Sequence, residues 1–146
     1  MLYKKAYGFR ALKPSKERNA ENTIYDLASL TKVVATTTSI MILLSRKEIS
    51  LWNDVLDYVE NFKKGVKIFH LLTYTSCLPP YSDVWKYSKF REGIFKSVLE
   101  ERPGCEPGSK IIYSCLNFIV LMIFVERVSG RSFKDFCEEN IFKPLS

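Results

Sequence analysis

Apolar positions along the 146-residue chain repeat mostly at helical spacing. The pattern predicts a helix that starts at Ser29 and ends near Arg46-Lys47, with apolar residues on most sides, as in a buried central helix. A loop over 103–108 is too rich in proline and glycine to be helical. Further helical segments are predicted at 51–59, 68–72, 85–99 and 118–125 (ended by Gly130), with a last one from Ser132, closed by Pro144.

The N-terminal part has a different pattern. Residues Leu2–Leu12 carry Tyr3, Tyr7 and Phe9 around a glycine, which predicts a strand, and Lys13–Asn19 reads as an exposed turn. The predicted fold class is therefore α+β, mostly helical, with one or two N-terminal strands. We expect a single domain over residues 1–146, with strand and turn in 1–24 and the helical part in 25–146, because no long linker or repeat divides the chain.

Composition narrows the class of protein. Hydrophobic residues make up 47% of the chain, but no apolar run reaches the length of a membrane span, so we expect a soluble protein without a membrane partner. No apolar segment of a secretory leader follows the first residues, which makes a cytoplasmic location the default. The net charge of +6 is spread among acidic residues, and we therefore expect no nucleic-acid partner.

Four cysteines, Cys77, Cys105, Cys115 and Cys137, are scattered without a Cys-x-x-Cys pair. This spacing does not suit zinc, so we expect no metal and no other cofactor. In a chain of this kind the cysteines are predicted to be reduced, partly buried thiols.

Ser29-Leu30-Thr31-Lys32 places a serine and a lysine almost one turn apart on the same side of the predicted helix. A serine hydroxyl needs a base to become a nucleophile, and a lysine with a pKa lowered by partial burial can serve as that base. The alternative is structural: Ser29 caps the helix and Lys32 is an ordinary surface lysine of the first turn.

The segment Tyr25–Lys32 resembles the nucleophile motif of the serine β-lactamase and penicillin-binding-protein family. The resemblance is closest to class C β-lactamases and related esterases and D-amino-acid peptidases, and it runs from about Tyr25 to the last residue. It implies the helical subdomain of a β-lactamase/transpeptidase-like fold, in which Tyr113 partners Lys32 as base and proton donor. Later landmarks resemble the family at Leu51–Val55, His70–Pro79, Glu106–Lys110 and Tyr113-Ser114-Cys115, the last matching a Tyr-x-Asn motif.

Three positions depart from the family pattern. Cys115 stands where an asparagine binds substrate and the catalytic lysine, so it is the predicted substrate-binding residue, and Asn117 lies two positions later. Tyr74 and Cys77 stand where the family usually has histidine and glycine. The family's third motif, Lys-Thr-Gly or His-x-Gly on a strand that supplies an oxyanion-hole N–H, has no counterpart in these 146 residues.

The leading hypothesis is a β-lactamase-related serine hydrolase that acts on the carbonyl of a small ester or amide, including β-lactams, through an acyl-Ser29 intermediate. Because the third motif has no counterpart in these residues, both an active hydrolase and a weak or inactive one remain open at this point. The alternative is a catalytically silent module that binds a partner or ligand through the same cleft. Because the helices' sheet-facing side is expected to be uncovered apolar surface, we predict a homodimer, with or without exchanged strands, or a separately encoded C-terminal half.

Overall fold

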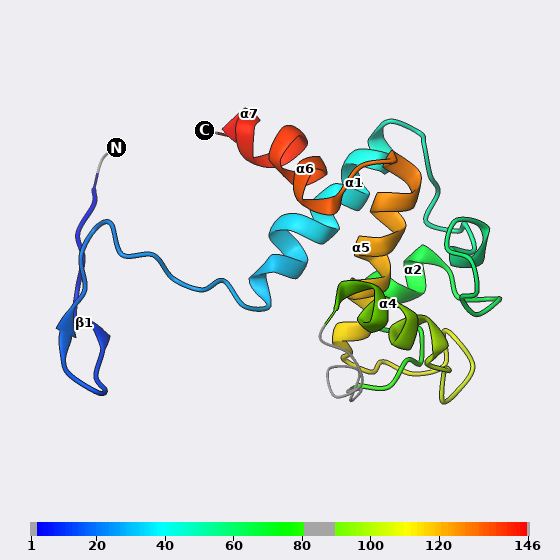
Figure 1. Cartoon of the computed structure of the whole chain (residues 1–146), viewed down its shortest axis with the longest axis horizontal. Coiled ribbons are helices and arrows are strands. Elements are labelled where there is room, and N and C mark those ends of the chain that lie inside the picture. The colour runs from blue at the N-terminus through cyan, green and yellow to red at the C-terminus, as the bar shows by residue number, and fades with distance from the viewer. Residues whose placement is uncertain (1–2, 81–89, 146) are drawn as a thin grey trace.

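The computed structural model describes residues 3–80 and 90–145 and contains a helical body and an N-terminal hairpin. Figure 1 shows the hairpin lying apart from the helices, joined to them by an extended segment. This arrangement confirms a mostly helical chain with a small sheet. In chain order the helical elements are η1 Lys32–Thr37, α1 Thr38–Ser45, η2 Val55–Asp57, α2 Ile68–Leu72, α4 Arg91–Glu100, α5 Cys115–Ser129, α6 Phe133–Cys137, η3 Glu138–Phe142 and α7 Lys143–Leu145.

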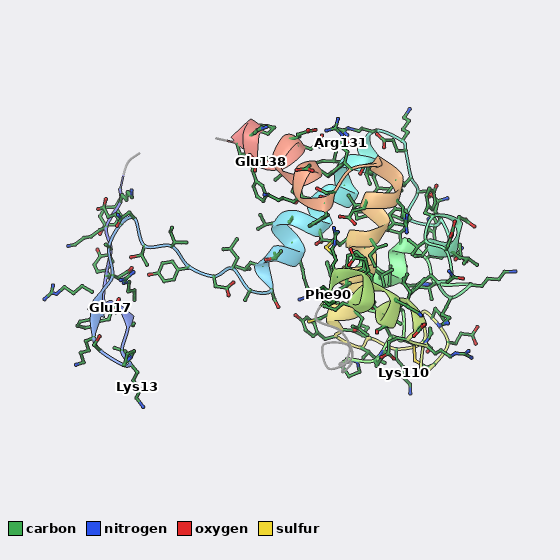
Figure 2. The ribbon with its side chains drawn as sticks, in the orientation of Figure 1. Lys13, Glu17, Phe90, Lys110, Arg131 and Glu138 are labelled. Carbon is green, nitrogen blue, oxygen red and sulfur yellow. A yellow bond between two sulfur atoms is a disulfide. The ribbon has the colours of Figure 1, made fainter. Side chains whose placement is uncertain are left out.

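The hairpin pairs β1 (Phe9–Ala11) with β2 (Glu17–Arg18) in antiparallel register. Lys13 lies at its tip in Figure 2. The predicted strand over Leu2–Leu12 is thus shorter than expected, and part of the predicted turn is a second strand. Arg10 forms a salt bridge of 2.6 Å with Glu17 across the pair. A second strand was allowed for, but its position was not predicted, because its two polar residues show no alternation of apolar positions.

The first helix runs over residues 30–45 and begins with the wide π-turn η1. Two hydroxyls accompany the wide turn: Thr37 and Thr38 each donate to a backbone oxygen five residues earlier. The prediction of a helix buried on most sides is wrong. Ile40 is fully buried, whereas the side chains of Val33 and Met41 are 55% and 60% exposed. No described residue covers the face of the helix that carries Val33 and Met41.

The core is built around α5, whose apolar residues are buried on nearly every side, as predicted. Ser114 caps its start by accepting a hydrogen bond from Leu116 N–H, and Gly130, in the left-handed region at φ 66°, ends it. Helices α1, α2, α4 and α6 contact α5. Among the helices of the described residues, none is long and apolar enough to cross a bilayer.

Two predicted helices differ in extent. Residues 51–59 contain only the short 3₁₀ helix η2, because the Asp54 carboxylate accepts hydrogen bonds from Leu56 and Gly65 N–H and folds the segment into a closed loop. The helix predicted at 85–99 begins, within the described residues, as α4 at Arg91, and its first part lies outside them. The predicted helix at 68–72 is confirmed as α2.

The C-terminal helices follow the prediction with one exception. Ser132 Oγ accepts from Asp135 N–H at 3.1 Å and caps α6, as expected. Pro144 does not close the segment but lies inside the last helical turn, α7. The helical backbone continues without a break from α6 through η3, so Pro144 lies near the C-terminal end of this helical stretch and not beyond it.

The prediction of four reduced cysteines is wrong. Cys77 and Cys105 form a disulfide, with their Cα atoms 5.4 Å apart, while Cys115 and Cys137 are free thiols. The pairing depends on folding, which brings together two loops that are 28 positions apart in the sequence.

Replacement of Phe124 by alanine is expected to lower the free energy of unfolding by about 3–5 kcal/mol. The Phe124 side chain is fully buried and its ring lies 4.8 Å from that of Tyr58, so the substitution leaves a cavity in the core. Urea denaturation followed by circular dichroism measures the effect. The control is Ile24→Ala, at a side chain 95% exposed, which is expected to change stability by less than about 0.5 kcal/mol. A loss below about 1 kcal/mol for Phe124→Ala would contradict this packing.

Candidate active site

Ser29 lies in the tight turn that starts the first helix. The Asp26 carboxylate accepts a hydrogen bond from Ala28 N–H at 2.8 Å, and Lys32 N–H donates to the Ser29 carbonyl at 3.1 Å. The local sequence thus turns the chain into the helix at this serine and leaves its side chain exposed. The Ser29 hydroxyl bonds to two side chains, those of Lys32 and Tyr113, an arrangement that differs from the capping role considered as the alternative.

Lys32 Nζ donates to Ser29 Oγ at 3.2 Å. Its ammonium also lies 5.5 Å from the ring centroid of Tyr113 and 6.0 Å from that of Phe118, within the range of cation–π attraction. The helix supplies this contact because residues three positions apart lie on one face. The half-buried lysine is therefore held over the serine by both a hydrogen bond and aromatic rings.

The expected lowering of the Lys32 pKa is wrong in direction. Partial burial, the largest single influence, lowers the pKa of Lys32, but hydrogen bonds and charge interactions with Tyr113 and Cys115 outweigh it. The pKa lies above its ordinary value of 10.5, and Lys32 is a charged donor at neutral pH. The physical reason is that the site is open, so the lowering of the pKa by burial is smaller than the combined raising by Tyr113 and Cys115.

Tyr113 comes from the loop before α5 and reaches Ser29 across 84 positions of sequence, with its hydroxyl 3.0 Å from Ser29 Oγ. A hydrogen bond with Ser29, followed by one with Lys32, lowers the pKa of Tyr113 from its ordinary 10.0. The shift has a simple cause, because both neighbours can donate to the phenolate oxygen and stabilise its charge. The side chain is 53% exposed, so an approaching substrate can reach it.

Cys115 is the first residue of α5 and has an exposed free thiol. Its influence contributes to the raised pKa of Lys32. Asn117, the other residue considered for this place, is fully buried; its amide oxygen accepts from Ser76 Oγ at 2.7 Å and its amide nitrogen donates to the Leu71 carbonyl at 3.1 Å. The amide of Asn117 therefore serves the core and not the site.

The structure brings Ser29, Lys32, Tyr113 and Cys115 together at one place on the surface, while their roles in a reaction stay predictions. It also adds a residue that the sequence analysis noted only as a departure from the family pattern. The ring of Tyr74 lies 4.9 Å from that of Tyr113. Only the unusual residue type at this position signalled it, since Tyr74 is 39 positions away from Tyr113.

A family model described as "Beta-lactamase" matches residues 1–146. The chain belongs to the beta-lactamase family. This confirms the resemblance inferred from the motifs and accounts for the partial, mostly helical fold.

Among curated relatives of this beta-lactamase family chain, "Penicillin-binding protein 4*" of Bacillus subtilis is 30% identical over 155 residues, covering 99% of the chain and 34% of the relative. The chain thus spans about a third of the length of that protein. Two solved structures share its fold. FmtA from Staphylococcus aureus has a TM-score of 0.80 at 23% identity, covering 95% of this chain and 40% of that one. A class C beta lactamase has a TM-score of 0.77 at 24% identity, covering 95% and 39%.

Proposed function

We propose that the protein is a serine hydrolase that transfers the acyl group of a small ester or amide, including β-lactams, to Ser29 and then to water. The observation that carries this proposal is the pair of hydrogen bonds at the Ser29 hydroxyl, 3.2 Å from Lys32 Nζ and 3.0 Å from Tyr113 OH. A serine hydroxyl that is hydrogen-bonded to a lysine ammonium and to a tyrosine with a lowered pKa has the arrangement of an activated nucleophile. Membership of a family that contains a penicillin-binding protein supports the same reading.

The geometry divides the proton work between the two partners of Ser29. The Lys32 ammonium is a donor only, so it bonds a lone pair of Ser29 Oγ and leaves the serine proton directed at Tyr113. In the reaction, Ser29 Oγ attacks the carbonyl carbon while its proton passes to the Tyr113 phenolate, and Tyr113 then protonates the leaving group. Water then attacks the carbonyl carbon of acyl-Ser29 while the same phenolate takes its proton, and Tyr113 returns that proton to Ser29 Oγ as the acid leaves. The role of base thus moves from Lys32 to Tyr113, and Lys32 stabilises the phenolate.

Intact-mass measurement after incubation with a β-lactam and, separately, with an activated acyl ester tests the proposal. We expect a mass increase of one acyl group, located by trypsin digestion and fragmentation in the peptide that spans 19–32 and contains Ser29. An adduct on any other peptide, or none with either reagent, would contradict acylation of Ser29.

The second candidate is a catalytically silent module, and two observations favour it. Cys115 replaces a carboxamide by a thiol, which is a poor hydrogen-bond donor. The family's third motif has no counterpart in these 146 residues, and loss of one oxyanion donor typically lowers the rate by about 10²–10³. An absent adduct together with saturable binding of an unreactive acyl analogue would favour this candidate.

We also propose that the substrate is an ester or a D-amino-acid peptide. A cytoplasmic location was the default expectation. The Cys77–Cys105 disulfide weighs against it, because such bonds persist mainly in oxidising compartments.

We also propose that a second copy of the chain covers the exposed apolar face, with the hairpin arms exchanged. The first helix exposes the apolar side chains of Leu30, Val33 and Met41, and the hairpin arm exposes Tyr7 and Phe9. Packing the arm of one copy on the helix of the other would bury both apolar surfaces. Light scattering is expected to give the mass of a dimer, and removal of residues 1–18 is expected to give a monomer. A monomer of the full chain at tens of micromolar would contradict arm exchange.

A further inference from the structure

The loop that delivers Tyr113 is attached to a second loop at three places. Gly104 N–H donates to the Cys77 carbonyl at 2.8 Å, Gly108 N–H to the Thr75 carbonyl at 2.7 Å, and Ile112 N–H to the Tyr74 carbonyl at 2.8 Å. The segments 104–112 and 74–77 therefore run side by side as far as the residue before Tyr113. We call segment 74–77 the docking segment.

The Cys77–Cys105 disulfide adds a covalent bond at the far end of the same contact. It lies beside the hydrogen bond of Gly104 and joins the docking segment to the start of the loop. Gly108, at φ 91°, turns the chain in between in a conformation that side-chain-bearing residues rarely adopt. A loop closed in this way has few alternative conformations, because each end of its contact is held.

Tyr74 contacts the reactive tyrosine directly. Its ring centroid lies 4.9 Å from that of Tyr113 and 5.4 Å from that of Phe118. Tyr74 and Cys77 have φ values of 60° and 61°, which such residues adopt only where the surrounding structure holds them. The backbone of the docking segment is therefore held in one conformation by its surroundings.

The other end of the Tyr113 region is anchored as well. Ser114 Oγ donates to the Pro79 carbonyl at 2.6 Å and caps α5. Ser76, inside the docking segment, donates to the buried Asn117 amide of the same helix. Tyr113 therefore sits between two anchored residues, Ile112 and Ser114, and both are attached to the segment 74–79.

From these contacts we propose that Tyr74 and the Cys77–Cys105 disulfide are positioning residues that hold Tyr113 against Ser29, so that the reactive site is complete only in the oxidised protein. This inference rests on the proposed function for its effect on acylation, but not for its effect on Tyr113 itself. Neither Tyr74 nor the disulfide needs to touch the reacting atoms, because they act through the loop.

Reduction of the disulfide is the direct intervention. Two electrons and two protons from a dithiol such as dithiothreitol convert Cys77 and Cys105 to two thiols, while the dithiol is oxidised to its cyclic disulfide. The hydrogen bonds between the loops remain available, but the covalent closure is gone. We expect Tyr113 to spend less time at 3.0 Å from Ser29, and displacements of about 1 Å can lower a rate by roughly 10²-fold.

The first readout does not depend on catalysis. The difference in phenolate absorbance between the full chain and its Tyr113→Phe variant isolates Tyr113 among eight tyrosines. In the oxidised protein we expect Tyr113 to ionise below its ordinary pKa of 10.0, and after reduction, or in Cys105→Ser, to ionise closer to that value. The control is Lys110→Ala, because Lys110 lies in the same loop but is exposed to solvent (Figure 2).

The second readout is the rate of acylation by the activated ester. We expect a fall of about 10- to 100-fold on reduction and in Tyr74→Leu, and recovery in Tyr74→Phe, which keeps the ring. Circular dichroism of the same samples separates positioning from unfolding. If Cys105→Ser does not fold, the Tyr74 pair carries the test alone.

The outcomes distinguish the two proposals. A shift of the Tyr113 titration on reduction without any acylation in either state supports positioning and contradicts the proposed function. Equal acylation and an unchanged titration in oxidised, reduced and Tyr74→Leu protein would overturn the positioning role and leave the proposed function standing.

Discussion

Replacing Ser29 by alanine is expected to abolish the acyl adduct with both the β-lactam and the activated ester. The side chain lies at the meeting point of Lys32 and Tyr113, and removing its oxygen removes the only group that both of them bond there among the described residues. Ser29 is exposed, and Lys32 and Tyr113 also lie outside the buried core, so the variant is expected to keep the fold. Intact-mass spectrometry measures the loss.

The matched control for this substitution is Ser45→Ala. Ser45 is an exposed serine at the other end of the same helix, where its hydroxyl donates to the Ile42 carbonyl. It is expected to be acylated as fast as the unmodified protein. An adduct that persists in Ser29→Ala would show that another nucleophile, such as the exposed thiol of Cys115, carries the reaction.

Replacing Tyr113 by phenylalanine is expected to slow acylation by about 10²–10⁴-fold, the range typical for loss of a general base. The ring remains in place to contact Tyr74 and Lys32, so the change removes the hydroxyl and little else. Rates measured with the activated ester by stopped-flow absorbance give the effect. A loss of less than about threefold would contradict the assignment of Tyr113 as the base.

The pH profile gives this prediction a second signature. In the proposed mechanism the base is the Tyr113 phenolate, so the rate is expected to rise with pH until the lowered pKa of Tyr113 is passed. It is expected to fall again above the raised pKa of Lys32, where the ammonium loses its proton. Without the phenol, the base left next to Ser29 is the free amine of Lys32, whose ordinary pKa of 10.5 lies above the lowered pKa of Tyr113. The rising limb in Tyr113→Phe is therefore expected at higher pH than in the unmodified protein.

Local features were predicted well from the sequence because their causes are local. The start of α6 depends on Ser132 and a carboxylate three residues on, and the end of α5 depends on Gly130. The spacing of Ser29 and Lys32 also follows from one turn of helix, and the structure places the two atoms within 3.2 Å. The short strand β2 and the closed loop at Asp54 escaped prediction because side-chain and pairing contacts override weak propensities.

Contacts between distant residues could not be read from the pattern. The sequence shows four cysteines, but only the folded chain brings Cys77 next to Cys105. It shows a lysine in the right place, but the direction of its pKa shift depends on Tyr113 and Cys115 on another element. Burial of a helix face also depends on what packs there, and Met41 is exposed despite its apolar surroundings in sequence.

The amino-acid sequence by itself determined the family, the order of the helices and the serine and lysine of the site, because turns, caps and helical spacing are set by residues a few positions apart. The tertiary structure alone decided that the ring of Tyr113 contacts Tyr74 and belongs to a loop closed by a disulfide. It also decided that the pKa is lowered at Tyr113 and raised at Lys32. Those properties are set by distances and charges in space, which separations of 28 to 84 positions along the chain do not reveal.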